Sequence, residues 1–279
     1  MIVVIGDLVA DLIVLGGASL ERGTDNPAEV RLTRGGSAAN VAMAVSARHP
    51  VRFIGRVGDD TLGVALVGEL TGAGVDVRVQ RGGRTGAIVV LVDAVGERTM
   101  ITDRGAAAEL EAVDPSWLDD ADWVHLPLYG FAAHGSRDTL IGVARGLAER
   151  GIPISVDLSS VATMRALGAA VLSETLGAVA PAVVFANADE ARTAEDLGLA
   201  FPGAVYVVKR GGDPVLVHES GHHSEVPVAR VQDVVDSTGA GDAFAAGYIV
   251  AALGGADALA SARGGADLAM RALRRAGAL

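Results

Sequence analysis

Short apolar runs rich in β-branched residues alternate along the chain with alanine-rich segments of helical length. The runs cover residues 2–5, 51–54, 123–126, 154–156, 183–185 and 205–208, and segments such as 139–150 and 188–197 lie between them. Strands that alternate with helices predict a parallel sheet, and continuously apolar strands are typical of a sheet buried on both faces. The expected fold class is therefore α/β, with helices on both faces of a mostly parallel central sheet.

Two stretches break this alternation. Residues 87–92 and 98–101 are joined by a five-residue loop that contains Gly96, which predicts a β-hairpin. Another short strand is expected at 30–32, after a loop rich in Gly, Asp, Asn and Pro. We expect these pieces to form a small antiparallel sheet, with lid segments near 12–34 and 84–102. Because no repeat or linker divides the chain, residues 1–279 are expected to form one domain.

Composition excludes several classes of protein. The 279 residues carry a formal net charge of −11, which argues against a general nucleic-acid binder. Cysteine is absent, so disulfides, thiolate metal sites and a catalytic thiol are excluded. The N-terminus lacks the basic region of a signal peptide, and the uncharged stretch 243–256 is too short to span a bilayer. We therefore expect a cytoplasmic protein with a small-molecule substrate and no membrane or nucleic-acid partner.

The most informative segment is the loop Asp236-Ser237-Thr238-Gly239-Ala240-Gly241-Asp242, which leads into an apolar helix expected from Ala243. Glycine permits tight backbone geometry and close approach of a ligand. The unpaired N–H groups and the positive dipole end of the helix favour an anion. A carboxylate at Asp242 is then placed to accept a proton beside a phosphate. The structural alternative is a glycine-rich turn with an acidic first helical turn.

Other nucleotide-binding motifs are missing. The chain contains no G-x-x-x-x-G-K-[ST], which excludes a P-loop kinase. No G-x-G-x-x-G follows the first strand, which disfavours a nicotinamide-dependent enzyme.

The loop 236–242 resembles the C-terminal signature of the ribokinase-like (PfkB) carbohydrate kinases. Further landmarks of that family appear in the family's order, at residues 35–40 (Gly-Gly-Ser-Ala-Ala-Asn), 54–60, 85–86, 96–98 and 187–190. The resemblance runs from residue 2 to about 253. It implies a three-layer sandwich with a β-sheet lid, and an enzyme that moves the γ-phosphate of ATP to a hydroxyl of a small sugar. ATP and Mg²⁺ are the implied cofactors.

The resemblance also implies roles for individual residues. Asp242 is the expected general base, and the backbone N–H groups of Gly239, Ala240 and Gly241 are expected to stabilise the transferred phosphoryl group. Substrate contacts are expected at Asp11, Gly36 and Asn40.

Nucleotide and metal contacts follow from the same resemblance. The expected ATP-binding residues are Asn187, Lys209, Gly211, Gly239 and Gly241. Glu190 and Asn187 are expected to hold Mg²⁺, mostly through water. Asp236 is assigned to a monovalent-cation site for K⁺.

Most of these residues also have a structural interpretation. Asn187 and Glu190 have the spacing of a capping box, which needs no ligand. Asp11 is alternatively a solvated acid in a turn, Lys209 a strand-end lysine beside a hairpin, and Gly35-Gly36 a turn into a helix at 38–47. Asp59-Asp60 are interpreted as N-cap residues only. Among the histidines, adjacent His222 and His223 point to opposite faces of a strand, which makes zinc binding improbable.

The substrate is less constrained than the reaction. Family members that bind ribose carry a glutamate after the strand equivalent to 123–126, whereas Pro127-Leu128-Tyr129 stands here. Arg104 is a candidate contact for an acidic or phosphorylated substrate, unless it is only an exposed lid arginine. A sugar-acid kinase of the 2-keto-3-deoxygluconate type and a nucleoside kinase are alternatives, although few aromatic residues lie near the lid to hold a base.

Two further hypotheses concern class and assembly. The alternative from another class is a non-catalytic sugar-binding protein on the same fold, against which the intact Asp242 loop argues. Relatives often dimerise through the lid, so a homodimer is a further expectation of the resemblance.

Overall fold

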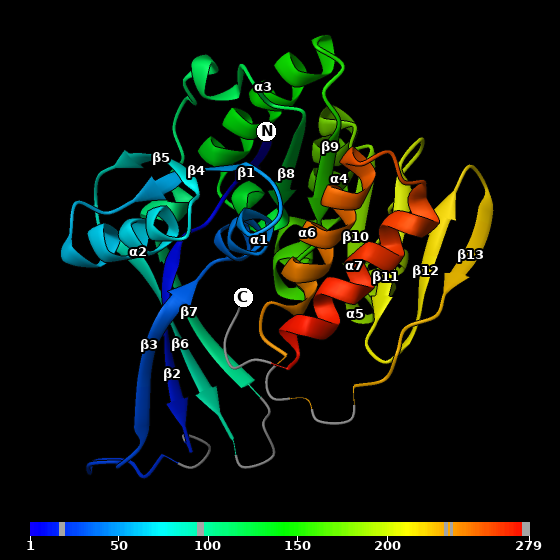
Figure 1. Cartoon of the computed structure of the whole chain (residues 1–279). Helices are drawn as coiled ribbons and strands as arrows, with labels where there is room; N and C mark the ends of the chain where they lie inside the picture. Colours follow the sequence, from blue (N-terminus) through cyan, green and yellow to red (C-terminus); the bar gives the residue numbers. More distant parts are fainter. Residues whose placement is uncertain (17–19, 94–97, 232–233, 235–236, 275–279) are drawn as a thin grey trace.

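Figure 1 shows the computed structural model, in which a large α/β body carries a smaller sheet that projects from one side. The structure describes residues 1–16, 20–93, 98–231, 234 and 237–274. Asp236 and most of the loop between the two lid strands therefore lie outside the described residues.

The large sheet has nine strands, in the order β13-β12-β11-β10-β9-β8-β1-β4-β5. All neighbours from β11 to β5 are parallel, and β12 and β13 add an antiparallel edge. The strands are β1 (Ile2–Ile5), β4 (Val51–Val57), β5 (Asp76–Arg81), β8 (Trp123–Pro127), β9 (Ile154–Asp157), β10 (Val183–Asn187), β11 (Val205–Arg210), β12 (Asp213–Glu219) and β13 (His222–Val226). The six apolar runs in the sequence are all strands of this sheet, as expected.

Helices cover both faces, which gives the expected three layers (Figure 1). The first face packs against α1 (Ser37–Ser46), α2 (Thr61–Gly72), α6 (Ala240–Leu253) and α7 (Ala258–Ala272). The second packs against α3 (His134–Glu149), α4 (Val161–Val179) and α5 (Ala188–Asp196). Short 3₁₀ helices lie at Ala106–Ala108, Pro115–Leu118 and Leu128–Phe131.

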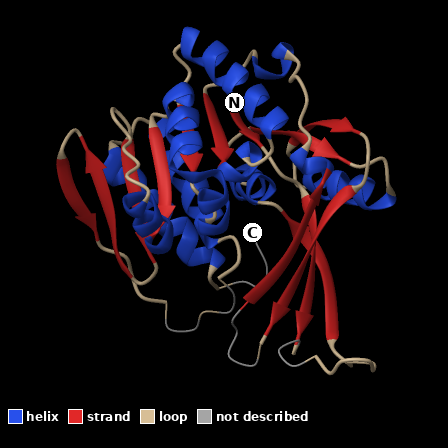
Figure 2. Ribbon diagram, turned by 180° about the vertical axis from the view of Figure 1, so that it is seen from behind, coloured by secondary structure: helices blue, strands red, loops and turns tan. Residues whose placement is uncertain are grey.

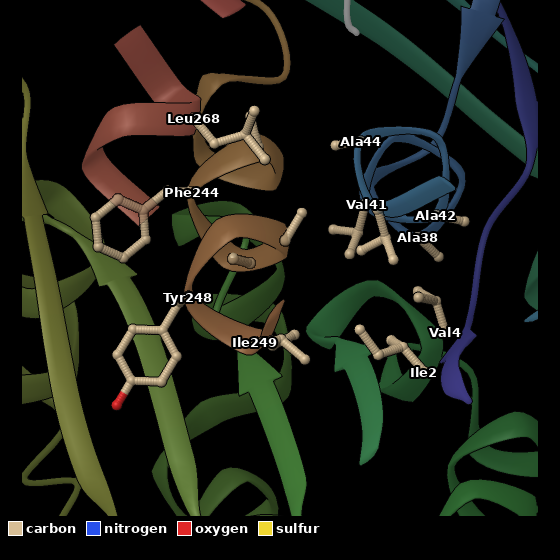
Figure 3. Close-up of a cluster of buried hydrophobic side chains, with 14 of the residues drawn as sticks. Ile2, Val4, Ala38, Val41, Ala42, Ala44, Phe244, Tyr248, Ile249 and Leu268 are labelled. Carbon is tan, nitrogen blue, oxygen red and sulfur yellow. The ribbon is translucent and has the colours of Figure 1, made fainter. Parts of the chain in front are cut away.

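The core on the first face brings α1 against α6, two helices separated by about two hundred residues in the chain. Figure 3 shows Val41 and Ala38 of α1 opposite Ile249 of α6, above Ile2 and Val4 of β1. All five side chains are fully buried. This packing holds the first turns of α1 and α6 close together, and both turns carry residues of the expected active site.

The smaller sheet has the order β3-β2-β6-β7, with β2 (Val9–Leu15), β3 (Glu29–Gly35), β6 (Thr85–Val92) and β7 (Arg98–Gly105). Its position agrees with the expected lid, but β2 and β6 pair in parallel, so the sheet is mixed and the expectation of an antiparallel sheet was wrong. Asp11 lies inside β2 rather than in a turn. The acid interrupts the apolar run 8–15, which hides this strand in the sequence.

Figure 2 shows the lid sheet from behind, joined to the body at one end. The chain enters the lid directly from β1 through residues 6–8 and from β5 through residues 82–84. The lid therefore begins at the carboxyl ends of the parallel strands of the large sheet. Among the described residues, no helix is both long and apolar enough to cross a membrane.

Candidate active site

Polar residues gather where neighbouring parallel strands end. Asp157 is the last residue of β9, Asn187 the last of β10, and Lys209 aligns with Asn187 on β11. Asp7 follows β1 on the same edge. Ligands of open α/β sheets bind at this edge.

Asp242 lies in the first turn of α6 and is half-buried. Its two carboxylate oxygens accept hydrogen bonds from α1, one from Ser37 Oγ at 2.7 Å and one from Asn40 Nδ2 at 2.9 Å. Burial raises the pKa of Asp242 to about 6, although these two hydrogen bonds favour the charged carboxylate. The residue is thus held in a fixed orientation with the pKa of a proton acceptor.

The Asn40 amide is oriented from its other side by Arg34, a buried arginine of β3. Arg34 Nη1 donates to Asn40 Oδ1, and Arg34 Nε donates to Glu69 Oε1 at 3.2 Å. Because its oxygen faces a guanidinium, the amide must turn its NH₂ group toward Asp242. Arg34, Asn40 and Asp242 therefore form one hydrogen-bonded chain.

The glycine loop leads into α6, which begins at Ala240, three residues before the expected start at Ala243. Gly239 is the N-cap in the left-handed conformation (φ 72°), and no side chain among the described residues caps the helix. The Ala240 N–H donates to Ser237 O at 3.3 Å, so this expected oxyanion donor is partly engaged within its own turn. A Cβ at Gly241 would lie 3.3 Å from Lys209 Nζ, which places an ammonium group beside the positive end of the helix.

Lys209 lies one residue before the end of β11, beside the β11–β12 hairpin as its structural interpretation expects, and its side chain is only 14% exposed and joins this cluster. Its Nζ donates to Asp157 Oδ2 at 2.6 Å. Burial lowers the pKa of Lys209, but the charges of Asp157, Glu190 and Asp242 outweigh burial and hold the pKa above its ordinary value. The lysine is therefore cationic and sits among three carboxylates.

Asn187 and Glu190 form the capping box expected from their spacing. Asn187 Oδ1 accepts from the N–H groups of Asp189 and Glu190, and Glu190 Oε2 accepts from Asn187 N at 2.8 Å. Glu190 is buried, and burial together with the Asp157 charge raises its pKa to about 7. Glu190 Oε1 also accepts from Asn187 Nδ2 at 2.7 Å, so the cap engages both Glu190 oxygens, and a Mg²⁺ beside Glu190 and Asp157 would be held through water.

Two glycines expected to admit ligands also have structural requirements. Gly36 has φ 102°, and a Cβ there would lie 2.4 Å from the carbonyl oxygen of Asp7. The close passage of this backbone thus explains the glycine without a ligand. Gly211 has φ 62° in the turn between β11 and β12, with open space where a Cβ would stand.

Asp11 and Arg104 face the same region from the lid. Asp11 Oδ1 is buried and has no hydrogen-bond partner within the described part of the chain. Arg104 Nη1 donates to Asp7 Oδ2 at 2.8 Å, and its guanidinium lies 3.7 Å from the centroid of the Tyr129 ring. The side chain is 19% exposed, so the interpretation of Arg104 as an exposed lid arginine was wrong.

The lid reaches the glycine loop through Arg98, whose Nη1 donates to Thr238 Oγ1. Asp60 caps α2 as expected, since its carboxylate accepts from Gly63 N at 2.8 Å. It also accepts from the backbone N–H and the hydroxyl of Thr85, the first residue of β6. Both ends of the lid are thus tied to the body.

Four residues of the site were missed in the sequence: Asp7, Arg34, Ser37 and Asp157. Asp7 and Asp157 carried a usable signal, because each is an acid at the end of an apolar run that forms a strand. Ser37 and Arg34 carried none, because their partners depend on the packing of α1. A cavity of about 810 Å³ lies elsewhere, between α5 and β11–β13, and is lined by Phe201, Tyr206 and His218 rather than by the residues above.

Comparison with known proteins finds a matching family and named relatives. The chain matches the model of the pfkB family carbohydrate kinases over residues 1–279. It is 37% identical over 239 residues to an ATP-dependent ribose-1-phosphate kinase of Halopiger xanaduensis, covering 81% of this chain and 76% of the relative. It is 30% identical over 254 residues to a fructokinase of Klebsiella pneumoniae, covering 85% and 82%.

Solved structures show the same fold at lower identity. An adenosine kinase of Sinorhizobium meliloti matches with a TM-score of 0.86 at 22% identity, covering 99% of this chain and 94% of the other. An uncharacterized sugar kinase of Pyrococcus horikoshii, solved in complex with ATP, matches with a TM-score of 0.83 at 23% identity, covering 100% and 94%. The fold is therefore that of the ribokinase and adenosine kinase group, and the chain belongs to the pfkB family of carbohydrate kinases.

Proposed function

We propose that Asp242 is the general base of an ATP-dependent sugar kinase. The observation that carries the proposal is the double hydrogen bond from Ser37 and Asn40 to a carboxylate whose pKa is raised to about 6. A base with a pKa near the working pH is deprotonated yet still accepts a proton. Its place in the first turn of α6 puts it beside the N–H groups that favour an anion.

The reaction follows from this placement. Asp242 takes the proton of the acceptor hydroxyl as the hydroxyl oxygen bonds to the γ-phosphorus of ATP, and the bond to the β–γ bridging oxygen breaks to release ADP. The N–H groups of Gly239, Ala240 and Gly241 stabilise charge on the transferred group. Lys209, whose ammonium lies beside Gly241, adds a cation on the same side. Positioning and charge neutralisation are what phosphoryl transfer requires of a protein.

Metal binding is part of the proposal. Glu190 and Asp157 are the carboxylates that would hold Mg²⁺ through water, with Asn187 fixing the orientation of Glu190. When bound, Mg²⁺ neutralises charge on the ATP phosphates. The K⁺ site assigned to Asp236 falls outside the described residues.

The proposed acceptor is a small sugar bound by Asp11, Gly36 and Asn40. The relatives are named for ribose 1-phosphate and for fructose, which supports a sugar acceptor. Sugar acids and nucleosides are the alternative acceptors. The nucleoside alternative is retained because adenosine kinase structures have a similar fold. A non-catalytic sugar-binding protein would not need a base held by two hydrogen bonds.

We also propose that two copies of the chain pair through the lid. Leu12, Leu32, Val89 and Ile101 align in one row across all four strands of the lid sheet. Leu32 and Ile101 are 62% and 60% exposed, so this row forms an apolar outer face. Light scattering after size-exclusion chromatography should give a molar mass twice that of the chain. The Leu32→Asp variant should give the mass of one chain.

The kinase proposal is tested by ADP release from Mg-ATP with sugars, sugar phosphates, sugar acids and nucleosides. We expect ADP release that depends on one of the sugar classes. ADP release that depends on nucleosides alone would show that the acceptor is a nucleoside and not a sugar. No ADP release with any acceptor would contradict the proposed activity.

A further inference from the structure

Two arginines of β7 lie on the lid face that bears Asp11. Asp11 aligns with Ile88 of β6, and Ile88 aligns with Thr102 of β7. Arg98 and Arg104 are separated from Thr102 by even numbers of residues, and side chains at even spacing in a strand share a face. Arg98 reaches Thr238 and Arg104 reaches Asp7, both on the body, so this face is turned toward the active site.

Arg104 is pre-organised to bind an anion. Its guanidinium is held at one edge by Asp7 and on one face by the Tyr129 ring. A guanidinium has five N–H donors, and Asp7 is the one acceptor that Arg104 contacts in the part of the chain the structure describes. The other donors form a fixed planar fork, which matches the oxygens of a phosphate or carboxylate.

Asp11 lies among cations without bonding to them. Arg34, Arg98 and Arg104 all act on its charge from a distance, and its buried Oδ1 has no partner among the described residues. A carboxylate oxygen in this state accepts a hydroxyl from a ligand. The region therefore offers one hydrogen-bond acceptor for a hydroxyl and guanidinium donors for an anion. A phosphorylated sugar carries both of these functional groups.

The anion site and the base are held by consecutive residues of α1. Asp7, the partner of Arg104, accepts from Ala38 N at 3.2 Å, while Ser37 Oγ donates to Asp242 at 2.7 Å. Tyr129 lies near both the anion site and the base, because the charges of Arg104 and Asp242 both act on its hydroxyl. An acceptor with one hydroxyl at Asp242 thus extends toward Arg104.

We propose that the acceptor is a sugar that already carries a phosphate group, which Arg104 binds while Asp11 binds a sugar hydroxyl. This inference rests on the proposed kinase function and narrows its substrate class. Phosphate is favoured over carboxylate because a phosphate dianion presents a larger charge and more oxygens to the fixed Arg104 fork. The hydroxyl oxygen bonds to the γ-phosphorus, its proton goes to Asp242, and the products are ADP and a sugar bisphosphate.

The test compares matched acceptors that differ by one group: ribose with ribose 1-phosphate and ribose 5-phosphate, fructose with fructose 6-phosphate, and gluconate as a carboxylate. We expect one phosphorylated sugar to exceed its neutral partner in kcat/KM for ADP release by about 10²-fold, as charge-assisted hydrogen bonds imply. Arg104→Gln should remove most of that advantage through KM, so that the phosphorylated sugar and its neutral partner become similar acceptors. Arg84→Gln, an exposed lid arginine paired with Asp103, is the matched control and should behave as wild type.

The outcomes separate the inference from the function on which it rests. If neutral sugars or gluconate are better acceptors than every phosphorylated sugar, the inference is wrong while the kinase function stands. If no acceptor yields ADP, the kinase function is contradicted, and calorimetry without ATP decides the inference instead. Tighter binding of the phosphorylated member to wild type than to Arg104→Gln supports it, and equal binding overturns it. The melting temperature of each variant checks that it folds.

Discussion

Asn40 Nδ2 donates a hydrogen bond of 2.9 Å to Asp242 Oδ2, joining the first turn of α1 to the first turn of α6 across 202 positions of sequence. The same amide receives a hydrogen bond from Arg34 on its oxygen. The base of the proposed reaction is therefore oriented by the lid strand β3 as well as by the body.

Activity should rise with pH as Asp242 loses its proton. Since burial raises the pKa of Asp242 to about 6, kcat/KM should increase up to that pH and level off above it. Ser37→Ala removes a hydrogen bond that favours the carboxylate, so its inflection should move to higher pH. A pH profile of ADP release measures both. An inflection that stays in place or moves to lower pH would argue against Asp242 as the titrating base.

Arg34 and Asn40 should act on catalysis as one unit. Arg34→Gln should lower kcat because the Asn40 amide loses the donor that fixes its orientation. In an Asn40→Ala background the same change should cost little more, giving a coupling free energy of about 0.5–3 kcal/mol in a double-mutant cycle. Arg31→Gln, three residues earlier on β3 and exposed, serves as the control. Additive effects of the two substitutions on kcat would show that Arg34 does not act through the hydrogen-bonded chain to Asn40 and Asp242.

The Lys209–Asp157 ion pair should matter for both folding and nucleotide binding. Lys209→Met leaves Asp157 buried without its cation, which costs about 3–5 kcal/mol in the free energy of unfolding. KM for ATP should rise in the same variant. Adding Asp157→Asn should recover stability, because it removes the uncompensated charge. Urea unfolding and ADP release measure the two effects, and a double variant less stable than Lys209→Met would refute the pairing argument.

Glu190 should make stability fall as pH rises. Burial raises its pKa in the folded protein to about 7, above the ordinary 4.5, so the folded state binds more protons than the unfolded state. The contribution of this group to stability is thus present below about 4.5 and is lost as pH rises through about 7. Urea unfolding from pH 5 to 8 measures the free energy of unfolding of wild type and of Glu190→Gln. The free energy of wild type minus that of the variant should decline as pH rises. A difference that grows with pH would contradict the burial argument.

The sequence predicted the parts of the fold that depend on local pattern. Continuous apolar runs located the central parallel strands because those strands are buried on both faces. β12 and β13 were not among the apolar runs, because polar residues such as His218 and Glu225 interrupt their apolar pattern at the sheet edge. Only a hairpin after Lys209 and a strand at His222-His223 were expected there. The parallel pairing of β2 with β6 could not be predicted, since it depends on how the chain returns after crossing β4 and β5.

The site divides in the same way. The glycine loop located Asp242 and Gly239 because a helix start carries its own signal. The partners of Asp242 required the packing of α1 against α6, which no local pattern reports. Arg34 acts through nearby Asn40, which in turn reaches Asp242, and Asp157 acts through Lys209. Only the folded structure connects Arg34 and Asp157 to the reaction.

The most direct measurement of the central claim is the kcat of Asp242→Asn for ADP release with the best acceptor. Asparagine keeps the size of the side chain but cannot take the proton, so we predict a fall of about 10²–10⁴-fold with an unchanged melting temperature. Asp267→Asn, an exposed acid on α7, should retain wild-type activity. Full activity of Asp242→Asn would show that another group takes the proton.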